Sequence, residues 1–294
     1  MKKILIIGST GMLAFDLTRV FKEDYEVIGV SRADFDITDK SAVENFTKNH
    51  MPDIVINTAA YHKTEECELN PEKSFSVNAI GAFNAAKAAK EIGAKIIFIS
   101  TDYVFDGRKE HYSESDAPNP LNVYGASKLA GEILTKIAND NFYIIRTSWL
   151  FGIHKSGKGH NFVSLMLEKA KNGENIKVVD DQFGSPTYTY DLAAKIKELI
   201  EKNAPADIYH ITNTSSCSWH ELAEKIFELV KLNPKIEKIK SSDRPSSVKR
   251  PKYSVLISEN LKKQGIDNLR PWPEALSAYL DEIKKACKML ITVK

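Results

Sequence analysis

The chain has 294 residues, of which 43% are hydrophobic and 27% charged, and its 41 basic and 39 acidic side chains leave a formal net charge of +2. This composition is typical of a globular protein with a sizeable core, and the near-neutral charge predicts no nucleic-acid partner and no binding to an anionic membrane surface. Three cysteines, Cys67, Cys217 and Cys287, are too few for a disulfide framework, and no stretch approaches the ~20 apolar residues of a membrane span, so we expect a reduced, cytoplasmic protein.

Strand-like and helix-like segments alternate through the first half of the chain. The strand-like runs are apolar throughout, which is typical of parallel strands covered by helices on both faces. The helical segments contain good helix formers, and Asp39 or Ser41 is placed to cap the second helix. The expected strands are 4–7, 25–30, 53–57, 95–100 and 142–148, and the expected helices are 12–21, 40–49, 70–91 (as one or two helices) and 127–138.

The regular alternation of strand-like and helix-like segments ends after Trp149. Further helices are expected at 161–171 and 218–231, while a helix at 191–202 and a strand at 208–212 could return to complete the first sheet. We therefore predict an α/β fold with a doubly wound, Rossmann-like parallel sheet and a smaller α/β cap domain. The sheet domain is assigned to residues 1–150, with 190–213 returning to it, and the cap domain to residues 151–189 and 214–294.

The first expected strand and helix are joined by the loop in IGSTGMLA. Gly8, Gly11 and Ala14 form a G-x-x-G-x-x-A pattern there. Glycines let the backbone turn tightly and approach a pyrophosphate, whose charge the helix N-terminus meets. A tight turn without a ligand is the alternative, and the position in the first strand–helix unit favours the phosphate site. The residues expected to contact a dinucleotide are Gly8, Ser9, Thr10, Gly11, Met12 and Leu13.

The stretch VYGASK supplies Tyr124 and Lys128, a Y-x-x-x-K pair at the start of a predicted helix. Four-residue spacing places both side chains on one helical face. A phenol with a pKa near ~10 is a poor acid–base catalyst at neutral pH, and a nearby ammonium is expected to lower that pKa. A surface pair is the alternative reading of such a motif. Asn78, in SVNA, is expected to bridge backbone groups near the same site.

The loop spacing, the Y-x-x-x-K pair and the strand ending in Ser-Thr together resemble the extended branch of the short-chain dehydrogenase/reductase superfamily. The resemblance implies that Thr101, rather than Ser100, hydrogen-bonds the substrate carbonyl. At the end of the second strand, Ser31 and Arg32 replace the acid that holds the ribose of NAD, which favours NADPH over NADH. The other residues implied to line the cofactor are Asp36 and Ile37, beside the adenine, and Thr58, Ala59 and Ala60.

The residues that follow Thr101 distinguish among the reactions of this branch. Its nucleotide-sugar dehydratases resemble one another in carrying Asp-Glu directly after the catalytic Thr. Here Asp102 is present, but the next residue is Tyr103. A neutral phenol does not readily replace a carboxylate base, so dehydration is disfavoured.

A closer resemblance covers nearly the whole chain, from Gly8 to about Leu280, in the strings STDYVFDG, YGASKLAGE, RTSWLFG, VVDDQFGSPTYTYDLA, CSWHELAEKIF, KRPKYSVL and LRPWPEAL. These are similar to the dTDP-4-dehydrorhamnose reductase family. The resemblance implies NADPH-dependent reduction of the C4 ketone of dTDP-4-dehydro-β-L-rhamnose, a dTDP-sugar as ligand, and a homodimer. The residues implied to bind the substrate are Asp102, Tyr103, Trp149, Asn161, Gln182, Thr187, Arg250 and Lys252.

The chain departs from the family pattern in AAYHKTEECE, where His62, Thr64 and Glu65 replace Thr, Val and Asp. Since these positions border the sugar pocket, a reductase for another nucleotide-activated 4-keto sugar is the first alternative. The second is a binding subunit resembling the NADP-binding beta subunit of methionine adenosyltransferase, against which the intact catalytic set argues. Some family members bind magnesium at a dimer interface, but only Asp16 lies near a matching position, so no essential metal is expected.

Overall fold

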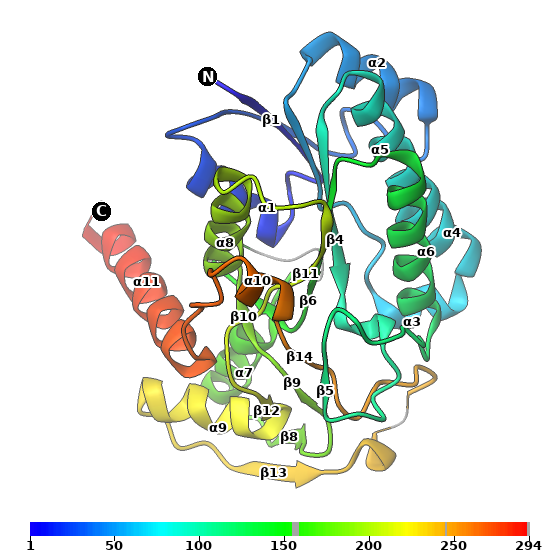
Figure 1. The fold of residues 1–294 in the computed structure, drawn as a ribbon. Helices are drawn as coiled ribbons and strands as arrows, with labels where there is room; N and C mark the ends of the chain where they lie inside the picture. The colour runs from blue at the N-terminus through cyan, green and yellow to red at the C-terminus, as the bar shows by residue number, and fades with distance from the viewer. Residues whose placement is uncertain (155–158, 245, 293–294) are drawn as a thin grey trace.

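The computed structural model describes residues 1–154, 159–244 and 246–292, with a six-stranded parallel sheet at its centre (Figure 1). The strand order is β11-β6-β4-β3-β1-β2, and every neighbouring pair runs parallel. The predicted doubly wound parallel sheet is confirmed. The strands are β1 (Lys3–Ile7), β2 (Glu26–Val30), β3 (Ile54–Asn57), β4 (Lys95–Thr101), β6 (Phe142–Thr147) and β11 (Asp207–His210).

Helices cover both faces of this sheet (Figure 1). On one face α1 and α8 pack against each other and against Ile4 and Ile6 of β1, while α2 and α5 cover Leu5 and Ile7 on the other face, with α6 beside α5. Asp39 caps α2 by accepting a hydrogen bond from the Ala42 amide at 3.0 Å, which confirms one of the two predicted caps. These helices are α1 (Met12–Phe21), α2 (Lys40–His50), α5 (Gly81–Glu91), α6 (Val123–Ala138) and α8 (Thr189–Glu201).

A π-helical turn, η1 (Ser76–Ile80), precedes α5 and carries Asn78. The Asn78 amide donates to the Tyr61 carbonyl and to the Ser127 hydroxyl, both at 2.9 Å, and its oxygen accepts from the Tyr61 amide at 2.8 Å. The predicted backbone bridge is therefore confirmed. Asn78 thus ties the segment after β3 to α6. Two short helices, α3 (Thr64–Leu69) and α4 (Pro71–Phe75), lie between β3 and η1 in the chain.

A second hydrophobic core, which includes Cys217, packs α7, α9 and α11 together. Its strands pair two by two, as β10 with β7, β12 with β9 and β13 with β8, while β14 pairs with β5. We retain the division into two domains as a prediction. The elements are β5 (His111–Tyr112), β7 (Leu150–Phe151), α7 (Phe162–Lys171), β8 (Ile176–Val179), β9 (Phe183–Gly184), β10 (Thr187–Tyr188), β12 (Cys217–Ser218), α9 (Trp219–Val230), β13 (Ile236–Ile239), β14 (Val255–Leu256), α10 (Glu259–Lys263) and α11 (Trp272–Thr292), with short 3-10 turns η2 (Asp102–Val104) and η3 (Ser241–Asp243).

Cys67 and Cys217 are buried, and the side chain of Cys287 lies outside the described residues. Within the described part of the chain, none of the helices combines the length and apolar character that crossing a membrane requires.

Candidate active site

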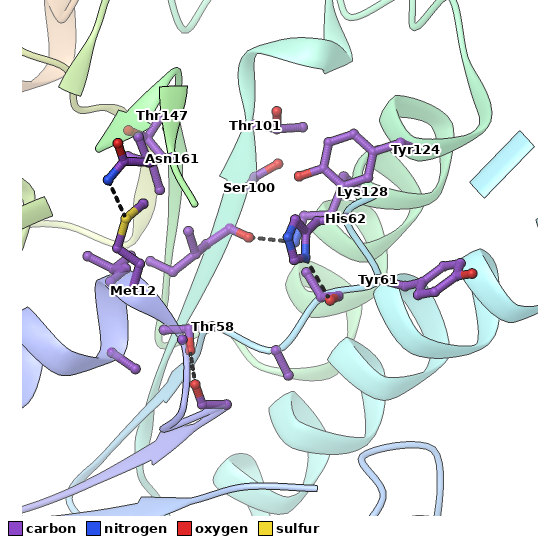
Figure 2. A pocket seen from close by; sticks show the side chains of 18 of the residues that line it. Met12, Thr58, Tyr61, His62, Ser100, Thr101, Tyr124, Lys128, Thr147 and Asn161 are labelled. Atoms are coloured by element: carbon purple, nitrogen blue, oxygen red, sulfur yellow. Dashed lines mark hydrogen bonds between the residues drawn. The ribbon is translucent and has the colours of Figure 1, made fainter. Parts of the chain in front are cut away.

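A cavity of about 750 Å³ lies at the carboxyl ends of β1, β3, β4 and β6, the edge at which open α/β sheets bind ligands. Figure 2 shows Met12 at the start of α1, side chains at the strand ends and side chains of α6 around this space. The predicted residues that line it are Gly8, Thr10, Gly11, Met12, Leu13, Ser31, Arg32, Asp36, Ile37, Thr58, Ala59, Ala60, Thr101, Asp102, Tyr124, Lys128, Trp149 and Asn161. The predicted residues that do not line it are Ser9, Tyr103, Gln182, Thr187, Arg250 and Lys252.

Gly8 and Gly11 shape the loop between β1 and α1. Gly8 has a φ of +89°, and a Cβ at this position would lie 2.8 Å from the backbone nitrogen of Ala59. Gly11 is the N-cap of α1, and no side chain caps this helix. The N–H groups at the helix start are therefore available to an anion, and the loop fits a pyrophosphate. The Ser9 side chain lies against Gly29 of β2 instead of the cavity.

The end of β2 presents Arg32 at the opening of the cavity. Its side chain is 78% exposed, and Nη2 lies 3.1 Å from Oδ2 of Asp36. Hydrogen bonds from the backbone and hydroxyl of Thr38 hold the pKa of Asp36 below its usual value. The Ser31 hydroxyl donates to Asp34 at 2.9 Å. Arg32 therefore places an exposed cation at this part of the cavity.

Ser100 and Thr101, which end β4, have different partners. The Ser100 hydroxyl donates to Oε1 of Glu132 at 2.5 Å. Glu132 also accepts two hydrogen bonds from Arg146, at 2.9 and 2.7 Å, in an ion pair whose side chains are 1% and 2% exposed. The Thr101 hydroxyl instead donates to Oδ1 of Asp102 at 3.0 Å. Since the buried ion pair holds Ser100, Thr101 is the hydroxyl better placed to meet a ligand.

Tyr124 and Lys128 lie one turn apart on α6 and point into the cavity (Figure 2). The ammonium of Lys128 donates to the Ile99 carbonyl at 2.6 Å and lies 4.0 Å from the centre of the Phe98 ring. Burial lowers the pKa of Lys128 to about 7, although the carboxylate of Glu132 opposes this shift. The lysine is thus a buried amine that titrates near neutral pH.

The phenol of Tyr124 behaves differently from the sequence-based prediction. Burial raises its pKa above the usual value, although the Thr101 hydroxyl opposes the shift. Because loss of water dominates and the Lys128 ammonium is bonded to the Ile99 carbonyl, the predicted lowering is wrong for this structure. A phenol with a raised pKa keeps its proton at neutral pH and can give it only to a strong base, such as an alkoxide that forms beside it.

Asp102 is a nearly fully buried carboxyl group beside Thr101. Its exposed fraction is 3%, and burial raises its pKa to about 6. Ser254 lies near the carboxyl, but its hydroxyl donates to the Phe183 carbonyl at 3.4 Å, and Oδ2 has no hydrogen bond to any described residue. Tyr103 packs edge-on against Tyr124, with ring centres 5.9 Å apart. Burial, with the nearby charge of Asp102, raises the pKa of Tyr103 to about 12.

An aromatic wall made of Trp149, Trp219 and Phe162 borders the cavity. The two indole rings stack with centres 3.5 Å apart, and Phe162 lies 4.6 Å from Trp219. Trp149 has a φ of +47°, a strained conformation for an aromatic residue. Any side chain at Gly184 would overlap its indole. The sequence predicts only Trp149 here, although a Trp at the first position of α9 was a visible signal.

Asn161 lines the cavity, but its amide is already bonded within the protein. Its oxygen accepts from the Ser164 amide at 2.9 Å and caps α7. Its nitrogen donates to the Gly152 carbonyl at 2.9 Å and to the Tyr279 hydroxyl at 3.1 Å. Asn161 therefore joins α7 to α11 and shapes the wall.

Gln182 and Thr187 lie outside the cavity. The Gln182 amide donates to the Ser241 hydroxyl at 2.8 Å. Thr187 is fully buried, and its hydroxyl donates to the Ser185 carbonyl at 3.1 Å. The proposed site therefore does not include ligand contacts from Gln182 or Thr187.

The two cations predicted near a diphosphate also lie outside the cavity. Arg250 forms an ion pair with Glu65, and its other nitrogen donates to the Ser246 hydroxyl at 2.9 Å. Lys252 is exposed, with its ammonium 4.9 Å from the centre of the Tyr253 ring. Glu65 is one of the departures from the family pattern, so the altered segment supplies the partner of Arg250.

Some polar residues of the cavity had no part in the sequence-based prediction, namely Tyr61, Lys73, Thr147, Ser148 and His160. Two further ones, Ser100 and His62, also line it; Ser100 was considered and set aside in favour of Thr101, and His62 was expected at the border of the sugar pocket. Thr147 and Ser148 end β6 in the string RTS, a signal similar to the string IST that ends β4. His62 belongs to the segment that departs from the family pattern.

The described residues contain no group of three or more His, Cys, Asp or Glu side chains that could hold a metal ion. Asp16 is fully buried between Arg19, at 2.7 Å, and the Thr189 hydroxyl, at 2.5 Å. Its carboxylate is thus already neutralised by a protein cation.

Comparison with known proteins identifies the family of this chain. Residues 1–285 match the RmlD substrate binding domain. The Bacillus subtilis (strain 168) spore coat polysaccharide biosynthesis protein SpsK is 39% identical over 289 residues, which cover 98% of this chain and 100% of the relative. Crystal structures of dTDP-4-dehydrorhamnose reductase from Clostridium acetobutylicum ATCC 824 (41% identity, TM-score 0.91, 96% of this chain and 99% of that one) and from Bacillus anthracis str. Ames in complex with NADP (38%, 0.92, 96% and 100%) are similar. The chain therefore belongs to the dTDP-4-dehydrorhamnose reductase family, as its motifs predicted.

Proposed function

We propose that this protein uses NADPH to reduce the C4 ketone of dTDP-4-dehydro-β-L-rhamnose, giving dTDP-L-rhamnose. The proposal rests on one observation. The same cavity is lined by Thr101, Tyr124 and Lys128 and by the glycine loop before α1, a helix that no side chain caps. The family supports the sugar, and the NADP complex of the B. anthracis relative supports the cofactor.

The residues around the cavity fit a dinucleotide. Gly8 and Gly11 leave room and N–H groups for the pyrophosphate, and Arg32 offers a cation for a 2′-phosphate. We therefore favour NADPH over NADH. When bound, the cofactor supplies the hydride that the C4 carbon of the sugar receives. Lys128, from the buried side of the cavity, holds the nicotinamide-side ribose.

Tyr124 is the proton donor of the proposed reaction. As C4 gains a hydride, its carbonyl oxygen becomes an alkoxide that must take one proton. Because burial keeps the phenol protonated, Tyr124 can give that proton, and the charged form of Lys128 stabilises the phenolate that remains. Thr101 orients the carbonyl by a hydrogen bond. Asp102 and Trp149 position the sugar ring.

We also propose a setting for this activity. The relative SpsK is named for spore coat polysaccharide biosynthesis, so we expect the activated sugar made here to serve polysaccharide synthesis. The proposal keeps three predictions from the sequence: the protein is cytoplasmic, it forms a homodimer, and it binds neither nucleic acid nor a membrane.

The test is loss of NADPH absorbance with freshly generated dTDP-4-dehydro-β-L-rhamnose, against NADPH alone, with the product identified by mass spectrometry and NMR. Substrate-dependent oxidation with formation of dTDP-L-rhamnose supports the reaction, the sugar and the donor together. Turnover only of another 4-keto sugar nucleotide would identify the altered segment around His62 as a specificity change. Tight NADPH binding without oxidation of any such sugar would favour the binding-subunit alternative.

A further inference from the structure

Thr147 ends β6 directly beside Thr101. The register of the two parallel strands pairs Thr101 with Thr147 and Ser100 with Arg146. Neighbouring strands lie about 4.8 Å apart, so the two threonines stand side by side at the carboxyl edge of the sheet. Both line the cavity, and Figure 2 draws both among its side chains.

The hydroxyl of Thr147 is buried and has no hydrogen-bond partner among the described residues. The residue is 4% exposed. A buried hydroxyl left without a partner costs about 1–3 kcal/mol, and most buried polar groups have a partner. Since this hydroxyl belongs to a residue that lines the cavity, a ligand is the natural source of the missing hydrogen bond.

The residues around Thr147 are held in place by other contacts. Arg146 is fixed by its two hydrogen bonds to Glu132, and the Ser148 hydroxyl donates to the Ser185 carbonyl at 2.6 Å. Trp149 is stacked on its neighbouring indole. The backbone of Thr147 is thus positioned on both sides, while its buried hydroxyl has no hydrogen bond within the described structure.

The strands β4 and β6 therefore end in the same way. In β4, Ser100 donates a hydrogen bond to Glu132, and in β6, Arg146 forms the ion pair with the same Glu132. In both strands the next residue is a threonine that lines the cavity. Thr101 is assigned to the C4 carbonyl, so a group at Thr147 is placed to meet a different oxygen of the same sugar. In a 6-deoxy-4-keto sugar, the carbons next to C4 carry a hydroxyl at C3 and a methyl at C5, so the C3 hydroxyl is the nearest polar group.

We propose that Thr147 is a substrate-contacting residue whose hydroxyl hydrogen-bonds the C3 hydroxyl of the keto-sugar. This inference rests on the proposed function and adds a specificity-determining residue to it. The contact fixes the rotation of the sugar ring about the carbonyl held by Thr101, and it favours sugars that keep an oxygen at C3.

The test variant is Thr147→Val, which removes the hydroxyl and keeps the shape. We expect kcat/KM for the keto-sugar to fall about 10- to 100-fold, because a buried partner is lost. NADPH affinity should stay within about twofold, and binding of dTDP-L-rhamnose to the NADP-loaded protein should weaken in calorimetry. Thr147→Ser, which restores a hydroxyl, should recover most of the loss.

The matched control is Thr135→Val. The Thr135 hydroxyl is also buried without a hydrogen-bond partner, but Thr135 lies on α6 and does not line the cavity. Thr135→Val should leave kcat/KM unchanged. In the ligand-free protein, neither valine variant should lower the midpoint of thermal unfolding, since each removes a hydroxyl that the fold does not use. A large loss of stability in Thr147→Val would assign a structural role to Thr147 and overturn the proposal.

A 3-deoxy analogue of the substrate gives a second readout. If Thr147 meets the C3 hydroxyl, the native protein and Thr147→Val should reduce the 3-deoxy sugar with similar kcat/KM. A penalty that persists with the analogue, an unchanged kcat/KM with the full substrate, or a loss confined to NADPH affinity would each overturn the proposal. Inactivity of the native protein on every 4-keto sugar would refute the proposed function itself, whereas an active native protein with an equally active Thr147→Val would refute only the Thr147 contact.

Discussion

The Ser100 hydroxyl lies 2.5 Å from the Glu132 carboxylate, while the adjacent Thr101 faces the cavity. Replacing these two hydroxyls should therefore have different effects. Thr101→Val should lower kcat/KM about 100-fold or more, because the carbonyl loses a hydrogen-bond donor that is worth most in the transition state. Ser100→Ala should mainly lower the free energy of unfolding, by about 1–3 kcal/mol. Steady-state kinetics and urea unfolding of both variants would check this, and a larger kinetic loss in Ser100→Ala would reverse the assignment.

Tyr124→Phe should remove the proton donor and keep the ring. We expect kcat to fall about 10²- to 10⁴-fold, the usual contribution of a positioned acid. NADPH affinity, measured by the change in cofactor fluorescence, should be nearly unchanged. Turnover at the native rate would reject Tyr124 as the acid.

Glu132→Gln should destabilise the protein strongly. It leaves Arg146, whose side chain is 2% exposed, without a counter-charge, and breaking a buried ion pair costs about 3–5 kcal/mol. The matched control is Asp140→Asn in the Lys90–Asp140 pair, which has the same 2.7 Å separation but exposed side chains. That change should leave the unfolding free energy almost unaltered. Equal effects of the two variants would show that burial of the pair does not matter.

The buried carboxyl of Asp102 should make stability depend on pH in a defined direction. Its pKa is raised from 3.8 to about 6, so between these values the folded protein binds more protons than the unfolded chain. The stability contribution of protonated Asp102 is present below pH ~4 and is lost as the pH rises through ~6. Relative to Asp102→Asn, the native protein should lose stability across this window and then stay lower by a constant amount. Urea unfolding at intervals from pH 4 to 8 would test this, and parallel curves would contradict it.

Arg32→Ala should reduce the preference for NADPH over NADH. A charge-assisted hydrogen bond to phosphate contributes about 1.5–3 kcal/mol, so the ratio of kcat/KM values should fall roughly tenfold or more. Arg108→Ala is a suitable control, since Arg108 is also highly exposed and paired with an aspartate but does not line the cavity. An unchanged ratio in Arg32→Ala would mean that another group reads the 2′-phosphate.

The sheet and the catalytic set could be predicted because their signals are local. Continuous apolar runs indicate buried parallel strands, and a tyrosine and a lysine four residues apart on a helix must share a face. The positions of Tyr124 and Thr101 then follow from the rule that ligands bind at the carboxyl ends of such strands. Asn78 was likewise predictable as a bridge.

Contacts between distant segments were not predictable in this way. Arg250 is paired with Glu65 from α3, and the amide of Asn161 is used by α7 and α11, partners that no local spacing reveals. The pKa of Tyr124 was predicted in the wrong direction because sequence shows which charges are near but not how much water is excluded. Thr147 was not predicted as a site residue, because a hydroxyl that lacks a hydrogen bond can be recognised only when the positions of all neighbouring residues are known.

The pairing of β11 with β6 also has a consequence for synthesis of the chain. A ribosome releases Phe142–Thr147 well before Asp207–His210, so the growing chain has a complete set of five adjacent strands whose outer edge is still bare. An unpaired parallel edge is a template for other chains. During translation, the six-residue edge of β6 therefore stays open until the shorter, four-residue β11 covers it, and a translational pause between the two segments should raise the demand for chaperones.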